Sequence, residues 1–326
     1  MSNIISVKDL RKYYQVFDKE PGILGTVKSL FNRKYSDAKA VDGISFEIDE
    51  GELIGFIGPN GAGKTTTLKV LSGLLYPTSG DVSVLGFTPW NRKTAYLKQF
   101  SLVMGQKNQL FWDLPAIDSF NLYKEIYEIS DLEYKKTLNE LVELLDVSEI
   151  LKVQVKKLSL GQRMKMELIA ALIHSPKLLF LDEPTIGLDV VMQKTLREFV
   201  ASYNKIKNAT IILTSHYMLD VKELAKRVII IDHGKILFDG LLAEVIKKFS
   251  SHKVLNISFE KEVKESDLVK FGDVSENNGL FSIGIKREDI SDITEQILKK
   301  FPVEDLTIEE PQIEDIIRQV FADKKV

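Results

Sequence analysis

The chain of 326 residues contains no cysteine, which excludes disulfides, thiolate metal sites and thiol catalysis. No apolar run approaches the roughly 18 residues of a membrane span, because Ile169–Ile173 ends at His174 and Leu178–Leu181 ends at Asp182. Met1–Lys12 lacks the apolar core of a signal peptide. The formal net charge is −3, and the basic residues show no clustered excess along the sequence. We therefore expect no nucleic acid among the partners. Any membrane process that this chain serves is expected to proceed through a partner.

The composition is that of a globular protein with a real core, since 44% of the residues are hydrophobic and 28% are charged. Apolar strand-like runs alternate with helical periodicity, which predicts an α/β fold with a mostly parallel sheet. The runs expected as strands of that sheet are Leu53–Ile57, Lys177–Leu181, Ile211–Thr214 and Val228–Ile231.

Two further regions differ from this pattern. From about residue 90 to residue 175 the periodicity is mostly helical. A boundary is expected near Ser250–His252, which predicts domains at residues 1–250 and 251–326. The second domain is expected to be a small α+β unit with strands at Val254–Phe259, Leu280–Ile285 and Val303–Ile308, and with a last helix from Pro311.

A glycine-rich loop follows the strand at Leu53–Ile57 and precedes a helical pattern. It reads Gly58, Pro59, Asn60, Gly61, Ala62, Gly63, Lys64 and Thr65, which matches the P-loop pattern G-x-x-x-x-G-K-[ST]. Backbone N–H groups of such a loop converge on phosphate oxygens, and the following helix N-terminus adds positive potential. We expect Lys64 to reach the β- and γ-phosphates and the Thr65 hydroxyl to bind Mg²⁺. The alternative is a chance glycine-rich turn, which the flanking strand and helix disfavour.

An apolar strand that ends in two acids lies downstream of this loop, at Leu178–Leu181 followed by Asp182 and Glu183. Asp182 is expected to hold Mg²⁺, directly or through water, and Glu183 to polarise an attacking water. Acidic residues often end strands for other reasons. The acid pair indicates a nucleotide site because it follows a P-loop in the same chain.

Leu158, Ser159, Leu160, Gly161 and Gln162 resemble the LSGGQ signature of ABC ATPases. Ser159 and Gln162 also have the spacing of a capping box that opens a helix over about 161–173, and the N-terminus of such a helix attracts anions. An ordinary capped helix is the alternative reading of these five residues. In ABC ATPases this segment meets the ATP held by the P-loop of the other subunit, so the resemblance implies a catalytic dimer.

The resemblance to ABC ATPases extends over about residues 4–245 and implies roles for further residues. By position, Gln106 resembles the Q-loop glutamine that senses Mg²⁺ and water, and Asp189 the D-loop aspartate that crosses the dimer interface. His216 resembles the switch histidine at the γ-phosphate. Tyr14 resembles the aromatic residue that stacks on adenine, with Tyr13 as its direct competitor. Thr66 belongs with the P-loop residues of the same site.

The sequence departs from the family pattern in two places. Leu160 stands where the signature has its first glycine, which brings a bulky apolar side chain near the closed dimer interface. Between Tyr14 and a strand expected near Ala40 lies an insertion, residues 18–37, longer than a tight hairpin. Its apolar spacing predicts a short amphipathic helix that packs on a membrane subunit, on the bilayer or on its own domain.

Two other segments are expected to face partners. Gln106–Phe120 includes Leu110, Phe111 and Trp112, and the resemblance implies a groove here for a coupling helix of the permease, with core filling as the alternative. Asp305–Ile316 resembles the end of the C-terminal extension of ATPases paired with ABC-2-type permeases. That extension is expected to steady the dimer.

These features predict an ABC-type P-loop α/β core with an inserted helical subdomain and a C-terminal α+β domain. The expected function is the ATP-hydrolysing subunit of an ABC transporter, of the ABC-2 exporter type, with ATP and Mg²⁺ as cofactors. The expected partners are transmembrane permease subunits and a second ATPase, identical or different, on the cytoplasmic face of the cell membrane. The alternative is an ABC ATPase that acts as a regulatory or mechanical switch on a soluble partner.

Overall fold

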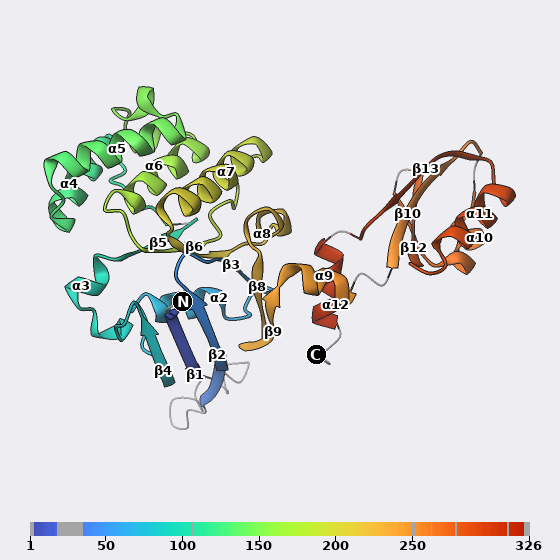
Figure 1. Cartoon of the computed structure of the whole chain (residues 1–326), viewed down its shortest axis with the longest axis horizontal. Coiled ribbons are helices and arrows are strands. Elements are labelled where there is room, and N and C mark those ends of the chain that lie inside the picture. The colour runs from blue at the N-terminus through green and yellow to red at the C-terminus, as the bar shows by residue number, and fades with distance from the viewer. Residues whose placement is uncertain are drawn as a thin grey trace, which may run out of the picture. The chain divides into compact units, whose positions relative to one another are not determined.

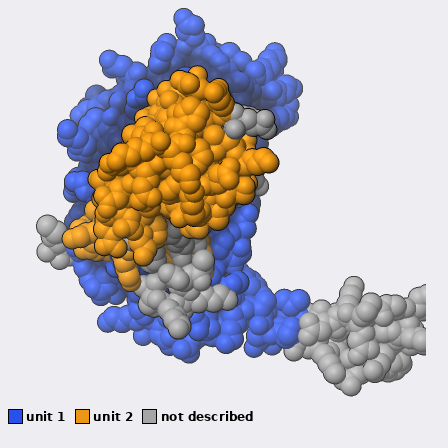
Figure 2. All heavy atoms as spheres, turned by 90° about the vertical axis from the view of Figure 1, so that its right-hand side faces the viewer, with its two compact units in different colours: residues 1–239 blue, residues 240–326 orange. Residues whose placement is uncertain are grey.

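The computed structural model describes residues 3–17, 35–105, 107–249, 252–261, 263–277, 279–311 and 313–322. The chain divides into two compact units, residues 1–239 and residues 240–326, which Figure 2 marks in separate colours. Among the described residues, no helix combines the length and the apolar character needed to cross a membrane. The amphipathic helix expected within residues 18–37 falls mainly on 18–34, outside the described residues.

The first unit is built on a six-stranded sheet in the order β5-β6-β7-β3-β8-β9. The pairs β5/β6, β6/β7, β7/β3 and β3/β8 are parallel, as the alternation of strands and helices predicted. The strands are β5 (Phe100–Met104), β6 (Leu178–Asp182), β7 (Thr210–Thr214), β3 (Leu53–Ile57), β8 (Arg227–Asp232) and β9 (Lys235–Leu241).

Each face of this sheet packs into its own hydrophobic core, because successive side chains of a strand point to opposite faces. In β6, Leu179 and Leu181 join one core, whereas Leu178 and Phe180 join the other. Helices α4–α7 gather on one side of the sheet in Figure 1. They are α4 (Ala116–Tyr127), α5 (Asp131–Leu145), α6 (Leu160–Leu172) and α7 (Val190–Lys207).

On the other side lie a three-stranded antiparallel sheet, ordered β2-β1-β4, and helix α2 (Figure 1). The strands are β1 (Asn3–Phe17), β2 (Tyr35–Asp49) and β4 (Ser79–Val84), and the helices here are α2 (Lys64–Leu71) and the short α3 (Thr94–Leu97). The second strand of the β1–β2 hairpin thus begins at Tyr35 rather than near Ala40.

The region over 90–175 is mostly helical, as expected, apart from one strand that was not predicted from the sequence. Residues 100–104 form β5 at the edge of the main sheet, where they pair with β6. A five-residue apolar run shows too few repeats to separate strand from helix. Within this region the short α3 precedes β5, and α4 follows with a buried face that contains Ala116 and Phe120. Leu122 and Ile126 of the same helix are 40% and 55% exposed.

The second unit begins with α9 (Leu242–Phe249) and ends with α12 (Ile313–Ala322), and these two helices contact each other. Between them, two helices and a four-stranded sheet in the order β11-β12-β10-β13 follow one another as β-α-β-β-α-β. The elements are β10 (His252–Phe259), α10 (Glu265–Leu268), β11 (Asp273–Asn277), β12 (Leu280–Lys286), α11 (Ile290–Lys300) and β13 (Val303–Glu309). The unit therefore includes α9, which the expected boundary at residue 250 assigned to the first domain.

Candidate nucleotide site

The loop at residues 58–63 joins β3 to α2 and is fixed by close backbone approaches. A Cβ atom added to Gly58 would lie 2.1 Å from the carbonyl oxygen of Ile231. Gly63 has φ +109°, and a Cβ there would lie 2.3 Å from the carbonyl oxygen of Ala40. These two positions require glycine on steric grounds, so the loop conformation is set by the strands that surround it.

The side chain of Lys64 folds back over this loop. Its Nζ donates to the carbonyl oxygens of Gly58 at 2.7 Å and Pro59 at 3.0 Å, and the residue is 5% exposed. Burial lowers the pKa of Lys64 from its ordinary value, while the carboxylates of Glu183 and Asp182 act in the opposite direction. An arriving phosphate would therefore supply the negative charge that this partly desolvated ammonium needs.

Asp182 ends β6 and gathers two hydroxyl groups. Thr65 Oγ1 donates to its Oδ2 at 2.8 Å, and Thr214 Oγ1 donates to its Oδ1 at 2.7 Å. Asp182 is 7% exposed. One carboxylate beside a threonine hydroxyl is an oxygen donor set of the kind that Mg²⁺ shares with nucleotide phosphates. The residues present therefore fit the metal expected from the sequence.

Glu183 and His216 face each other at the same end of the sheet. His216 Nε2 lies 2.7 Å from Glu183 Oε1. Glu183 has φ +55°, a left-handed conformation that is uncommon outside glycine and clusters at functional sites. Its backbone N–H donates to both the carbonyl and the hydroxyl oxygen of Thr214, each at 3.1 Å, which anchors this conformation to the end of β7.

A cavity of about 210 Å³ opens where these groups meet. It is lined by Thr65, Lys69, Met104, Gly105, Lys107, Asp182 and Glu183. Gly105 N donates to Asp182 O at 3.0 Å, which places the end of β5 beside the acids. Gln106, the third residue expected at the metal, lies outside the described residues. Thr214 is a site neighbour that sequence reasoning missed, although its place next to Ser215 and His216 at a strand end was a usable signal.

The segment that resembles the signature opens α6 with the predicted capping box. Gln162 N donates to Ser159 Oγ at 3.2 Å, and Ser159 N donates to Gln162 Oε1 at 3.0 Å. A Cβ on Gly161 would lie 2.8 Å from the side chain of Met192 in α7, so this glycine permits the two helix starts to approach. Leu160, the departure from the family pattern, is 38% exposed.

Asp189 caps α7, since its Oδ1 accepts the N–H of Met192 at 2.9 Å. The next two residues, Val190 and Val191, are each 76% exposed. The N-termini of α6 and α7 therefore present Leu160 and these two valines as exposed apolar side chains beside polar caps.

Tyr13 and Tyr14 occupy different environments on β1. The hydroxyl of Tyr13 donates to Asp42, and this hydrogen bond raises the pKa of Tyr13. Tyr14 is 38% exposed, with Lys12 Nζ 5.0 Å from the centre of its ring. It pairs with Ala38, two residues from Ala40, whose carbonyl oxygen approaches Gly63 of the loop. Tyr14 is thus the more available ring for stacking.

Together, the glycine loop, the two acids and the capped α6 define an ATP-binding cassette of the P-loop class. A family model described as "ABC transporter" matches residues 41–186, and one described as "EvrA-like ABC transporter, C-terminal domain" matches residues 251–309.

Curated relatives agree with these matches. The chain is 33% identical over 226 residues to the linearmycin resistance ATP-binding protein LnrL of Bacillus subtilis (strain 168), covering 69% of this chain and 72% of the relative. It is 30% identical to the ABC transporter ATP-binding protein NatA of the same organism, covering 72% of this chain and 95% of the relative. The chain belongs to the family of ABC transporter ATP-binding proteins.

Solved structures support the fold. A structure titled as the ATP-binding subunit of an ABC transporter superposes with a TM-score of 0.63 at 24% identity, covering 76% of this chain and 93% of the other. A dimeric ATP-binding cassette in a post-hydrolysis state, bound to ADP and Pi, superposes with a TM-score of 0.60 at 21% identity, covering 73% and 98%. The protein is thus an ATP-binding and ATP-hydrolysing subunit that powers an ABC transporter.

Proposed function

We propose that two ATPase subunits enclose two MgATP molecules and drive an ABC-2-type exporter. In each site one subunit provides the P-loop with Lys64, Thr65 and Thr66, together with Gln106, Asp182, Glu183 and His216. The other subunit provides the segment around the N-terminus of α6, with Ser159, Gly161 and Gln162, and Asp189 at the start of α7. Tyr14 stacks on the adenine. The observation that carries the proposal is the Glu183–His216 contact of 2.7 Å beside the P-loop lysine.

The residues of this chain have distinct tasks in hydrolysis. Lys64 and the loop N–H groups hold the phosphates. Thr65 and Asp182 would hold the Mg²⁺ ion, which would supply charge neutralisation in the transition state. Glu183 orients a water and accepts its proton as the water oxygen bonds to the γ-phosphorus. The bond from that phosphorus to the bridging oxygen of ADP breaks, so the products are ADP and phosphate. His216 holds the Glu183 carboxylate and faces the γ-phosphate.

Exposed aromatic and apolar side chains support a docking surface for the permease. Leu110 is 6% exposed and belongs to the core, whereas Phe111, Trp112 and Leu114 are 47%, 44% and 46% exposed. Nearby, a cavity of about 560 Å³ is lined by Lys69, Ser72, Leu74, Leu75, Phe100, Leu102, Met104, Lys107, Asn108 and Gln109. We place the coupling helix of the permease on this surface, on the cytoplasmic face of the membrane. The relatives named for linearmycin resistance and for bacitracin transport support export.

The test of hydrolysis is phosphate release by the purified full-length chain and by Lys64→Ala and Glu183→Gln. Lys64→Ala is expected to lose tight nucleotide binding, and Glu183→Gln to retain binding but lose turnover. A Glu183→Gln variant that turns over at the wild-type rate would contradict the assigned role of Glu183. For docking, Asp113→Lys reverses a charge that lies 2.8 Å from Lys156 within this surface. Transport-coupled ATPase that is unchanged by Asp113→Lys would argue against the surface.

A further inference from the structure

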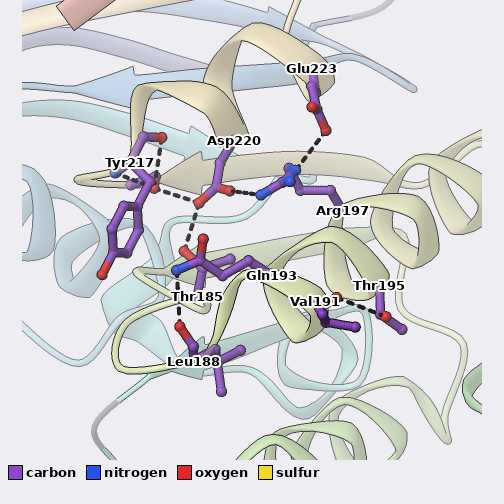
Figure 3. A network of polar contacts seen from close by, with 10 residues as sticks. Thr185, Leu188, Val191, Gln193, Thr195, Arg197, Tyr217, Asp220 and Glu223 are labelled. Atoms are coloured by element: carbon purple, nitrogen blue, oxygen red, sulfur yellow. Dashed lines mark hydrogen bonds and ion pairs between the residues drawn. The ribbon is translucent and has the colours of Figure 1, made fainter.

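A buried carboxylate ties together three segments of the candidate site. Asp220, in the first turn of α8 (Met218–Leu224), is 0% exposed. Its Oδ2 accepts hydrogen bonds from Thr185 Oγ1 at 2.6 Å and from Ser215 Oγ at 2.7 Å. Its Oδ1 accepts one from Arg197 Nη1 at 2.9 Å. Figure 3 shows the carboxylate between Thr185 and Arg197.

Two of these partners adjoin the groups that face the γ-phosphate in the proposed mechanism. Thr185 lies two residues after Glu183, and Ser215 directly precedes His216. One oxygen atom of Asp220 therefore holds the chain next to both members of the Glu183–His216 pair. Ser215 Oγ also accepts the backbone N–H of Tyr217 at 2.9 Å, so the chain is held on both sides of the histidine.

Arg197 pairs with the buried carboxylate and orients it inside the protein. It lies on α7 and is 4% exposed, and its Nε donates to Glu223 Oε2 at 2.6 Å (Figure 3). A buried carboxylate without such a partner would be strongly disfavoured. The side chain of Glu223 is 46% exposed. Of these two carboxylates, Asp220 is the one that accepts the hydroxyl groups of Thr185 and Ser215. Asp220 and Glu223 thus share one arginine, but Asp220 is the one that also binds the segments that follow β6 and β7.

We propose that Asp220 is a positioning residue for ATP hydrolysis, which acts by fixing the loop after β6 and the loop after β7 to one point. It touches no nucleotide and acts through Glu183 and His216, so the inference rests on the roles proposed for these two residues. A network of this kind is expected to matter more than its separate hydrogen bonds, since its members polarise and orient one another. The Arg197 contact adds α7, which begins at the cap of Asp189.

The variants that test this role differ in which contact they remove. Asp220→Asn removes the charge that orients the network, and Glu223→Gln is its matched control on the same arginine. Thr185→Val and Ser215→Ala each remove one hydroxyl and leave the Asp220–Arg197 pair in place. Thr185→Ser restores a hydroxyl at the first position. These single-hydroxyl variants keep the test available if Asp220→Asn does not fold.

The measurements are kcat and KM for ATP by phosphate release from the full-length chain, with the urea midpoint of each variant. We expect kcat to fall about tenfold or more in Asp220→Asn, Thr185→Val and Ser215→Ala, because small misplacements of catalytic groups lower rates strongly. The KM for ATP is expected to change by less than about threefold, since the P-loop is untouched. Thr185→Ser should recover most of kcat, and Glu223→Gln should stay within about twofold of the wild type.

Equal kcat values for Asp220→Asn and Glu223→Gln would overturn the proposal, as would full activity of both Thr185→Val and Ser215→Ala. Losses of activity that follow the urea midpoint across all variants would also overturn it, because a purely structural role predicts that pattern. Glu183→Gln and His216→Ala, measured in the same assay, show whether the proposed mechanism itself holds, independently of the role of Asp220. If those two variants lose turnover while Asp220→Asn is normal, only the positioning role is wrong.

Discussion

His216 Nε2 lies 2.7 Å from Oε1 of Glu183, and the two residues follow the ends of different strands, β7 and β6. Glu183 reaches this contact with a backbone φ of +55°, which is uncommon for a residue with a side chain. The surrounding hydrogen bonds to Thr214 hold that conformation. The geometry at the end of the sheet is therefore set by the backbone as well as by the side chains.

Gly105→Ala is expected to disturb this geometry without removing any polar group. A Cβ at position 105 would lie 2.2 Å from the carbonyl oxygen of Glu183, so the backbone of Glu183 must shift. We expect kcat to fall by about 100-fold while nucleotide binding is retained. The measurements are phosphate release and binding of a fluorescent ATP analogue.

The matched control for Gly105→Ala is Gly284→Ala in β12 of the second unit. There the nearest atom to an added Cβ lies at 3.7 Å, which is ordinary contact. This control should leave kcat unchanged. Wild-type activity of Gly105→Ala would contradict the claim that hydrolysis depends on the backbone position of Glu183.

Tyr14→Ala is expected to weaken ATP binding about tenfold, a loss of ~1.4 kcal/mol, because the exposed ring provides a stacking surface. Tyr13→Phe removes the hydroxyl that donates to Asp42 and should leave ATP affinity nearly unchanged. Titration with a fluorescent ATP analogue measures both. A Tyr14→Ala variant that binds the analogue as tightly as the wild type would contradict the adenine contact assigned to Tyr14.

His174 is expected to make stability depend on pH. Burial lowers the pKa of His174 to about 4, and its ring stacks on Tyr127 at 3.8 Å between centroids. Because the folded pKa lies below the unfolded value of about 6.5, the unfolded chain binds more protons between these limits. Stability is therefore fully present above about pH 6.5 and falls as the pH approaches 4, by at most about 3 kcal/mol.

The measurement for His174 is the free energy of unfolding in urea at pH 7 and at pH 4.5. Between these two pH values the free energy of unfolding should fall less in His174→Asn than in the wild type. The difference should be a large part of the about 3 kcal/mol attributed to His174. His233→Asn is the control, since the side chain of His233 is 85% exposed. Identical pH dependence in the wild type and His174→Asn would contradict the burial argument.

The two-unit division predicts where the chain can be shortened. Leu242 and Val245 of α9 and Ile316 and Ile317 of α12 are buried, and the two helices contact each other. A chain ending at residue 250 keeps α9 without α12, so we expect it to aggregate more than a chain ending at Asp239. Light scattering of both chains tests this.

The same two truncations test the proposed role of the second unit. Weaker ATP-dependent dimerisation of the chain that ends at Asp239 would support the view that residues 240–326 steady the dimer. Dimerisation and ATPase activity equal to those of the full chain would contradict it.

The sequence alone predicted the parts of the site that follow local rules. The capping box at Ser159 and Gln162 fixed the start of α6 to within one residue, because its two hydrogen bonds depend on residues three apart. The buried strands β6, β7 and β8 were predicted from short apolar runs, and the P-loop from its pattern of glycines. The P-loop pattern and the acidic end of a strand predicted Thr65 and Asp182 at one Mg²⁺ site, and the Thr65 hydroxyl donates to Asp182 at 2.8 Å.

Other parts depend on contacts between distant segments, which leave little local trace. β5 was missed because five residues do not show a period, and its place is fixed by pairing with β6. Thr214 contacts Asp182, and Asp220 contacts Thr185, across 32 and 35 residues of the sequence.

The central claim is a composite ATP site shared by two subunits, and Glu183→Gln tests it most directly. The measurement is size-exclusion chromatography with light scattering of the full-length variant, with and without MgATP. The account predicts a monomer without nucleotide and a trapped dimer with MgATP, together with loss of phosphate release. A variant that binds MgATP and remains monomeric would contradict a site completed by a second copy of this chain.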